Sequence, residues 1–121
     1  MSDSVSTFFA SWGLDRSAER RDQIARVVDD DTVYADPRTP NALRGTAAIA
    51  DYVGEFAASA PGWSATVVRS DSNAAVTRVT VAFRGPGPDG NEQTQFGQYF
   101  VELEADRIAR MVGFVGTGVP E

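Results

Sequence analysis

The amino-acid sequence predicts an α+β fold in which helices come first and an antiparallel sheet follows. Apolar residues recur at helical spacing up to about residue 60, and from Trp63 onward they alternate with polar residues, as in half-buried strands. Turn-forming residues separate the alternating segments, so neighbouring strands are expected to pair as a meander. We therefore predict three N-terminal helices packed on one face of a curved antiparallel sheet.

Three helices are predicted in the first half of the chain, over residues 3–12, 15–28 and 46–60. Gly13 ends the first, Asp15 caps the second, and Pro61-Gly62 ends the third. The third helix has a strong apolar face with members at i, i+3, i+4 and i+7: Ile49, Tyr52, Val53 and Phe56.

Five strands are predicted, over residues 32–35, 63–68, 75–83, 94–103 and 108–115. The first is read as a short edge strand, because Asp36-Pro37 stops it. Gly97 and Gly113 lie inside strand patterns, where glycine is typical of a bulge or a bend. A bent sheet wrapped around helices leaves a conical hollow, which is the natural place for a ligand.

The composition indicates one domain, residues 1–121, and excludes several kinds of chemistry. Hydrophobic residues make up 42% and charged residues 23%, as in ordinary globular proteins. The sequence has no cysteine, histidine or lysine. Thiolate nucleophiles, histidine-based triads, Schiff-base lysines and Cys- or His-ligated metals are therefore excluded. We expect no cofactor and no metal.

The charge and hydropathy pattern limits the partners. The net charge is −6, and the arginines are scattered without a basic stripe, so no nucleic acid is expected to bind. No apolar run reaches the length of a membrane span. The start MSDSVSTFF lacks the features of a secretory signal. We therefore expect a cytoplasmic protein with no membrane partner.

Four features occur in a specific order: an aromatic first helix ending in Trp12, the segment DDTVYADP at 30–37, the block RGTAAI at 44–49, and Asp106-Arg107-Ile108. This order resembles the nuclear transport factor 2-like (cystatin-like α+β) superfamily, particularly its SnoaL-like and ketosteroid isomerase-like branch. The resemblance covers nearly the whole chain. It implies a cone-shaped pocket and a homodimer, and a superfamily of isomerases, dehydratases, cyclases, epoxide hydrolases and non-catalytic adaptors.

Asp36 is the candidate general base. In proteins similar to ketosteroid isomerase, the aspartate of a strand-end Asp-Pro moves a proton beside a carbonyl, and Asp36 occupies that place. A carboxylate at the mouth of an apolar cavity loses solvation and can take a proton from a carbon acid. The alternative is that Asp36 satisfies backbone N–H groups of an Asp-Pro turn.

The donors that would stabilise an enolate oxygen are left open by the resemblance. Phe8 falls where the isomerase has its donor tyrosine, and Gly97 or Gln98 falls where it has its neutral acid. Steroid isomerase activity itself is therefore not expected. Substitute donors are Tyr52, Tyr34, Tyr99, Gln95 and Gln98. Each tyrosine also fits a simpler role as a wall aromatic whose hydroxyl reaches water.

Two functions follow for this hollow. Its predicted apolar wall consists of Phe8, Trp12, Tyr34, Phe56, Trp63, Val79, Val81, Gly97, Tyr99, Met111, Gly113 and Val115, although Phe8 and Trp12 could equally fill it. The first function is binding of a small hydrophobic molecule by a homodimer formed through the outer sheet face, at Thr66, Thr80 and Phe100. The second is a cofactor-free isomerase, cyclase or dehydratase acting on a hydrophobic carbonyl compound through Asp36. The lack of a second acid favours the first.

Overall fold

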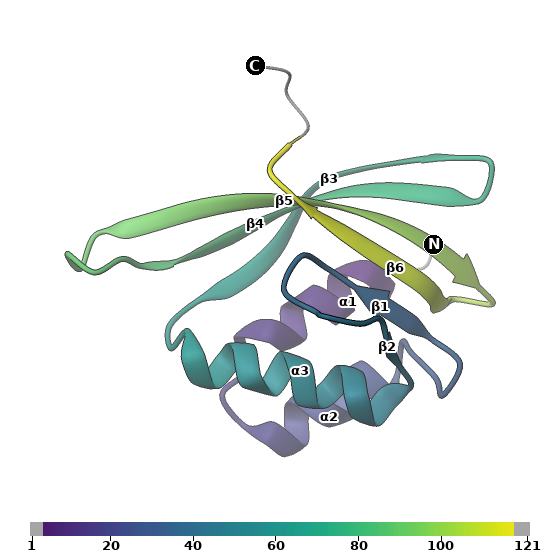
Figure 1. Cartoon of the computed structure of the whole chain (residues 1–121), viewed down its shortest axis with the longest axis horizontal. Coiled ribbons are helices and arrows are strands. Elements are labelled where there is room, and N and C mark those ends of the chain that lie inside the picture. Colours follow the sequence, from purple (N-terminus) through teal and green to yellow (C-terminus); the bar gives the residue numbers. More distant parts are fainter. Residues whose placement is uncertain (1–3, 118–121) are drawn as a thin grey trace.

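The computed structural model describes residues 4–117. Its helices are α1 (Ser4–Ala10), the 3₁₀ turn η1 (Ser11–Gly13), α2 (Ser17–Ala25) and α3 (Thr46–Ser59). Its strands are β1 (Val33–Ala35), β2 (Leu43–Arg44), β3 (Ser64–Asn73), β4 (Val76–Pro86), β5 (Glu92–Glu104) and β6 (Arg107–Val115). Figure 1 shows the helices on one side of the long, bent strands. The predicted α+β architecture is confirmed.

The strands form one sheet in the order β2-β1-β6-β5-β4-β3. The four long strands pair antiparallel with their neighbours, so the predicted meander is also confirmed. The prediction of β1 as an edge strand was wrong. β1 pairs parallel with β6 on one side and antiparallel with β2 on the other. β2 has only two residues, too few to give a sequence period, and this is why it was missed.

The register shifts of the long strands, which mark bulges or other irregularities, do not lie at Gly97 or Gly113. The register shifts between Val67 and Arg69 in β3 and between Glu102 and Leu103 in β5. Gly113 has a different function: a Cβ there would lie 2.4 Å from the Tyr99 ring. The glycine therefore leaves room for the Tyr99 ring to lie across β6.

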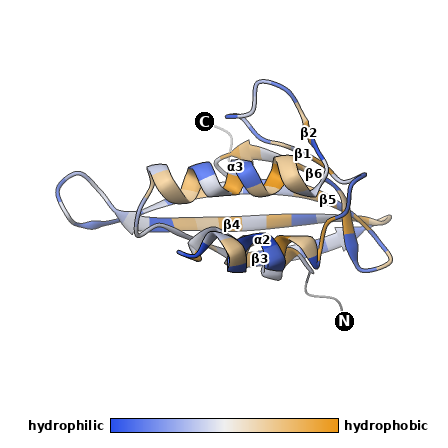
Figure 2. Cartoon of the chain, turned by 90° about the horizontal axis from the view of Figure 1, so that it is seen from below, coloured by the Kyte–Doolittle hydropathy of each residue, from blue (hydrophilic) through white to orange (hydrophobic). Residues whose placement is uncertain are grey.

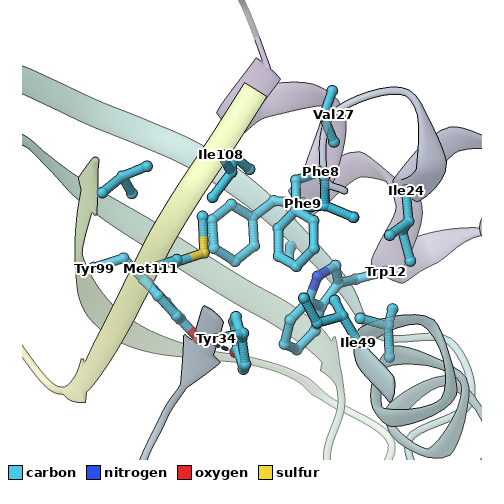
Figure 3. Packing of buried hydrophobic residues seen from close by; sticks show 14 of the residues in the cluster. Phe8, Phe9, Trp12, Ile24, Val27, Tyr34, Ile49, Tyr99, Ile108 and Met111 are labelled. Carbon is cyan, nitrogen blue, oxygen red and sulfur yellow. Dashed lines mark hydrogen bonds between the residues drawn. The ribbon is translucent and has the colours of Figure 1, made fainter. Parts of the chain in front are cut away.

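The core fills the space between the helices and the inner face of the sheet. Figure 3 shows Phe8, Phe9 and Trp12 from the N-terminal segment packed toward Met111 and Tyr99 of the sheet. The Phe9 and Tyr99 rings make an edge contact with centroids 4.8 Å apart. The hydroxyl of Tyr99 is thereby held at one place under the helices.

The second helix is shorter than predicted. It ends at Ala25, and Val27 and Val28 are buried beyond its end. The backbone N–H of Ile108 donates to the carbonyl of Val27 at 2.7 Å, which ties this turn to the start of β6. The valines therefore follow the helical period of the sequence while lying in a turn.

The hydropathy of the chain differs between the β4–β5 hairpin and helix α3. Figure 2 shows a hydrophilic tip on the β4–β5 hairpin, which projects from one end of the molecule, and hydrophobic turns along α3. Within residues 4–117, no helix combines the length and apolarity needed to span a bilayer.

Candidate functional site

A cavity of about 960 Å³ opens at the end of the helical layer. It lies between the C-terminal half of α3 with the turn that follows it, the loop after β1, the end of β4, the first half of β5 and the end of β6. Eight aromatic residues border it: Trp12, Tyr52, Phe56, Trp63, Phe83, Phe96, Tyr99 and Phe114. Among the described residues that line it, Asp36 and Arg38 carry the charges. A large apolar hollow with few polar groups is the usual form of a small-molecule site.

The two oxygens of the Asp36 carboxylate accept different hydrogen bonds. Its Oδ1 accepts backbone N–H bonds from Arg38 at 2.8 Å and Thr39 at 3.2 Å, as in an Asp-Pro turn. Its Oδ2 accepts hydroxyl bonds from Tyr34 and Tyr52, both at 2.6 Å. The turn therefore fixes the carboxylate, and the tyrosines occupy the oxygen that the turn leaves free.

Tyr99 extends this cluster into a short chain of hydroxyls. Its oxygen lies 3.3 Å from the oxygen of Tyr34, and Figure 3 shows the contact as a dashed line. Tyr34 has one hydroxyl hydrogen, which Asp36 accepts, so Tyr99 is the donor to Tyr34. An O–H···O separation of 3.3 Å is long for a hydrogen bond, so Tyr34 accepts the Tyr99 hydroxyl only weakly and this hydroxyl can turn to another acceptor.

The three tyrosines are held in the protonated form. Burial is the main cause that raises the pKa of Tyr34, Tyr52 and Tyr99 above the usual value of 10, and the nearby Asp36 charge raises each further. All three hydroxyls are therefore neutral hydrogen-bond donors at any physiological pH.

The positions of these groups follow from three separate elements. Tyr34 and Asp36 are two residues apart at the end of β1, and residues i and i+2 of a strand share a face. Tyr52 comes from the apolar face of α3, and Tyr99 from the inner face of β5. The two-residue alternation of strand side chains predicts that Tyr34 and Asp36 share a face, but the contact between them was not predicted from it.

The predicted site residues separate into two groups. Bordering the cavity are Trp12, Asp36, Tyr52, Phe56, Trp63, Gly97, Tyr99 and Val115. Deeper in the structure, away from the cavity surface, are Phe8, Tyr34, Val79, Val81, Met111 and Gly113. Phe83 and Arg38 also border the cavity. Phe83 continues the alternation of Val79 and Val81 on β4, so the strand period was sufficient to find it.

Trp63 forms a fixed wall at the mouth. Its indole N–H donates to the carbonyl of Pro86 at 3.2 Å. A Cβ on Gly85 would lie 2.4 Å from the indole ring, so the ring lies directly against the glycine backbone. The end of β4 thereby fixes the position of the Trp63 ring beside the cavity.

The residues that the structure describes do not form a metal-binding cluster. Across residues 4–117, acidic side chains do not gather in groups of three that would suit a metal ion. The chemistry of the cavity rests on one carboxylate, one guanidinium and the hydroxyls described above.

Comparison with known proteins agrees with this architecture. The family model described as the SnoaL-like domain matches residues 5–111. The chain belongs to the SnoaL-like family. This confirms the resemblance to the SnoaL-like and ketosteroid isomerase-like branch of the nuclear transport factor 2-like superfamily. No curated protein matches the sequence.

Several solved structures share the fold of this SnoaL-like protein. One, from Agrobacterium tumefaciens, is provisionally named an isomerase of the SnoaL-like family; it is 24% identical, with a TM-score of 0.80 over 94% of this chain and 95% of its own. A ketosteroid isomerase-like fold from Catenulispora acidiphila, in complex with trimethylamine, is 10% identical, with a TM-score of 0.77 over 94% and 85%. TerC, co-crystallised with polyporic acid, is 13% identical, with a TM-score of 0.71 over 93% and 91%. At these identities the similarity shows the fold alone.

Proposed function

We propose that this SnoaL-like protein binds a flat, largely apolar carbonyl compound in the cavity and moves a proton on it, with Asp36 as general base. The observation that carries the proposal is the Asp36 carboxylate, which borders a cavity of about 960 Å³ and is bonded to tyrosine hydroxyls as well as to its turn. The reaction class is a cofactor-free isomerisation, cyclisation or dehydration. Two structures of this fold hold small molecules, trimethylamine in one and polyporic acid in the other, which supports a binding role for the cavity.

The proton transfer requires a free lone pair on Asp36. Both hydroxyl donors act on Oδ2, and the backbone donors occupy Oδ1. Tyr52 is half-buried and borders the cavity, so its hydroxyl can turn from Asp36 to the carbonyl oxygen of a ligand. That single movement frees the base and supplies a donor to the oxygen on which negative charge develops.

Tyr99 supplies a second donor for the same oxygen. It borders the cavity, and its proton is held by Tyr34 only across 3.3 Å. The neutral acid that the ketosteroid isomerase-like resemblance calls for is absent at Gly97 and Gln98. In this proposal, Tyr52 and Tyr99 perform its function. The proton taken by Asp36 returns to another carbon of the ligand in an isomerisation, to the new alkoxide in a cyclisation, and to the leaving hydroxide in a dehydration.

A screen of hydrophobic carbonyl compounds tests this function. Wild-type protein is compared with Asp36→Asn, which keeps the shape of the side chain and removes the basic oxygen. Asp29→Asn is the matched control, because Asp29 also accepts a backbone N–H two residues ahead, at 2.9 Å, and lies outside the cavity. We expect turnover by wild type and Asp29→Asn and a loss of at least about 100-fold in Asp36→Asn. Equal turnover by all three would rule out Asp36 as the base.

We also infer a homodimer formed through the outer face of the sheet. Phe100 and Phe114 lie on this face by strand register, and Phe114 also reaches the rim of the cavity. They are 39% and 55% exposed and make an edge contact with ring centroids 5.8 Å apart. Thr66, on β3, is exposed, and Thr80, on β4, is half-buried. Paired phenylalanines on a solvent-facing strand surface favour burial against a second copy of the same surface.

A further inference from the structure

We infer that the ligand carries an anionic group and that Arg38 binds this group at the mouth of the cavity. This inference rests on the proposed binding function and narrows its ligand class to apolar acids. Arg38 lies in the loop after β1, directly beyond the Asp36-Pro37 pair, and its side chain is exposed where the cavity opens.

The two charged side chains of the cavity, Asp36 and Arg38, differ in how many hydrogen bonds and ion pairs they make. The Asp36 carboxylate accepts four hydrogen bonds, from Tyr34, Tyr52 and the backbone of Arg38 and Thr39. These bonds fill its acceptor capacity. The guanidinium of Arg38 makes no hydrogen bond or ion pair within residues 4–117. The unmatched charge at the cavity is therefore positive.

The arginines whose side chains make no ion pair or hydrogen bond within residues 4–117 are Arg26, Arg38, Arg69 and Arg84, and of these Arg38 alone borders the cavity. Arg21, Arg44 and Arg78 each pair with an aspartate at 2.9 to 3.3 Å. Asp36 is only two residues from Arg38, yet it bonds the backbone N–H of Arg38 and leaves the guanidinium free. A guanidinium beside an apolar cavity, with five N–H donors available, suits a carboxylate or a sulfonate on the ligand.

The guanidinium also acts on the groups deeper in the cavity. Its charge lowers the pKa of Tyr52 and Tyr99, in opposition to their burial, so it lies within electrostatic range of both hydroxyls. A ligand held at Arg38 by its anionic group would therefore extend its apolar body along Trp12 and Phe56. The cavity volume of about 960 Å³ is ample for such a molecule.

Two fluorescent probes that differ by one anionic group test the inference. N-Phenyl-1-naphthylamine is neutral, and 1-anilinonaphthalene-8-sulfonate is the same skeleton with a sulfonate. The sequence has two tryptophans, Trp12 and Trp63, and both border the cavity, so saturable quenching of tryptophan emission places a probe there. We expect both probes to bind wild type, and the sulfonate to bind several-fold more tightly.

Arg38→Ala is expected to weaken the sulfonate about fivefold and to change the neutral probe by less than twofold, since exposed ion pairs contribute up to about 1 kcal/mol. The backbone N–H on Asp36 survives this substitution, so the turn is kept. Arg38→Lys should retain most of the preference. Arg69→Ala is the matched control, because it removes one positive charge from the outer sheet face.

The outcomes separate this inference from the proposed function. If neither probe quenches the tryptophans, the binding function itself fails. If both bind equally and Arg38→Ala changes neither, the cavity binds apolar molecules and the anionic ligand class is wrong. If Arg38→Ala weakens both probes alike, or if Arg69→Ala matches its effect, Arg38 does not recognise the anion, and the inference is overturned.

Discussion

Tyr34→Phe isolates the buried hydroxyl that supports Asp36. The substitution removes one oxygen from a side chain that is 1% exposed and leaves its ring in place. The substitution removes the 2.6 Å hydrogen bond to the Asp36 carboxylate and the oxygen that accepts the Tyr99 hydroxyl. A buried hydrogen bond to a charged group contributes about 1.5–3 kcal/mol, so we expect the free energy of unfolding to fall by about 2 kcal/mol.

The same loss can be expressed as a melting temperature. An unfolding entropy of about 2.1 cal/mol/K per residue over 121 residues gives about 0.25 kcal/mol/K, so 2 kcal/mol corresponds to about 8 °C. Tyr52→Phe is the matched control, because Tyr52 donates to the same oxygen at the same 2.6 Å but is only half-buried. Water can replace its hydroxyl, so about 2–4 °C is expected. Urea unfolding followed by circular dichroism, together with calorimetry, measures both variants. Equal losses, or no loss in Tyr34→Phe, would refute the argument from burial.

Two further predictions concern pH and assembly. Because burial raises the folded-state pKa of Tyr34 and Tyr99 above 10, the folded protein keeps protons that the unfolded chain loses. Unfolding free energy should therefore be unaffected by these groups below about pH 10 and should fall as the pH rises above it. Urea titrations at pH 9 and pH 11 should show a smaller fall in Tyr99→Phe than in wild type, and an identical fall would contradict the prediction. For assembly, light scattering at micromolar concentration should give the mass of two chains for wild type and of one for Phe100→Glu, whereas a monomeric wild type would exclude the dimer.

The fold was readable from the sequence wherever an element was long enough to show its period. The change from helical to alternating spacing at Trp63 predicted the order of elements and the meander. The two-residue strand β2 left no period, and its pairing with β1 moved the predicted edge strand to the inside of the sheet. Val27 and Val28 show the opposite case, in which helical spacing continues after the helix has ended.

The candidate site was harder to predict from the sequence, because its side chains come from segments far apart in the chain. Asp36 was identified from its Asp-Pro motif and Tyr52 from the face of α3, but their contact depends on how α3 crosses β1. Gly113 was read as a bend, although its function is to leave space for Tyr99. Such close approaches depend on three-dimensional packing, which a single sequence does not encode as a local pattern.

The most direct test of the account is hydrogen exchange on a bound ketone in D₂O, because it reports the proton transfer without requiring a known product. A carbonyl compound that quenches Trp12 and Trp63 is incubated with wild type, Asp36→Asn and Asp29→Asn, and deuterium at the carbon beside the carbonyl is measured by mass spectrometry. The account predicts rapid incorporation with wild type and Asp29→Asn, and incorporation at the uncatalysed rate with Asp36→Asn. Equal incorporation by wild type and Asp36→Asn, with the ligand bound by both, would contradict it.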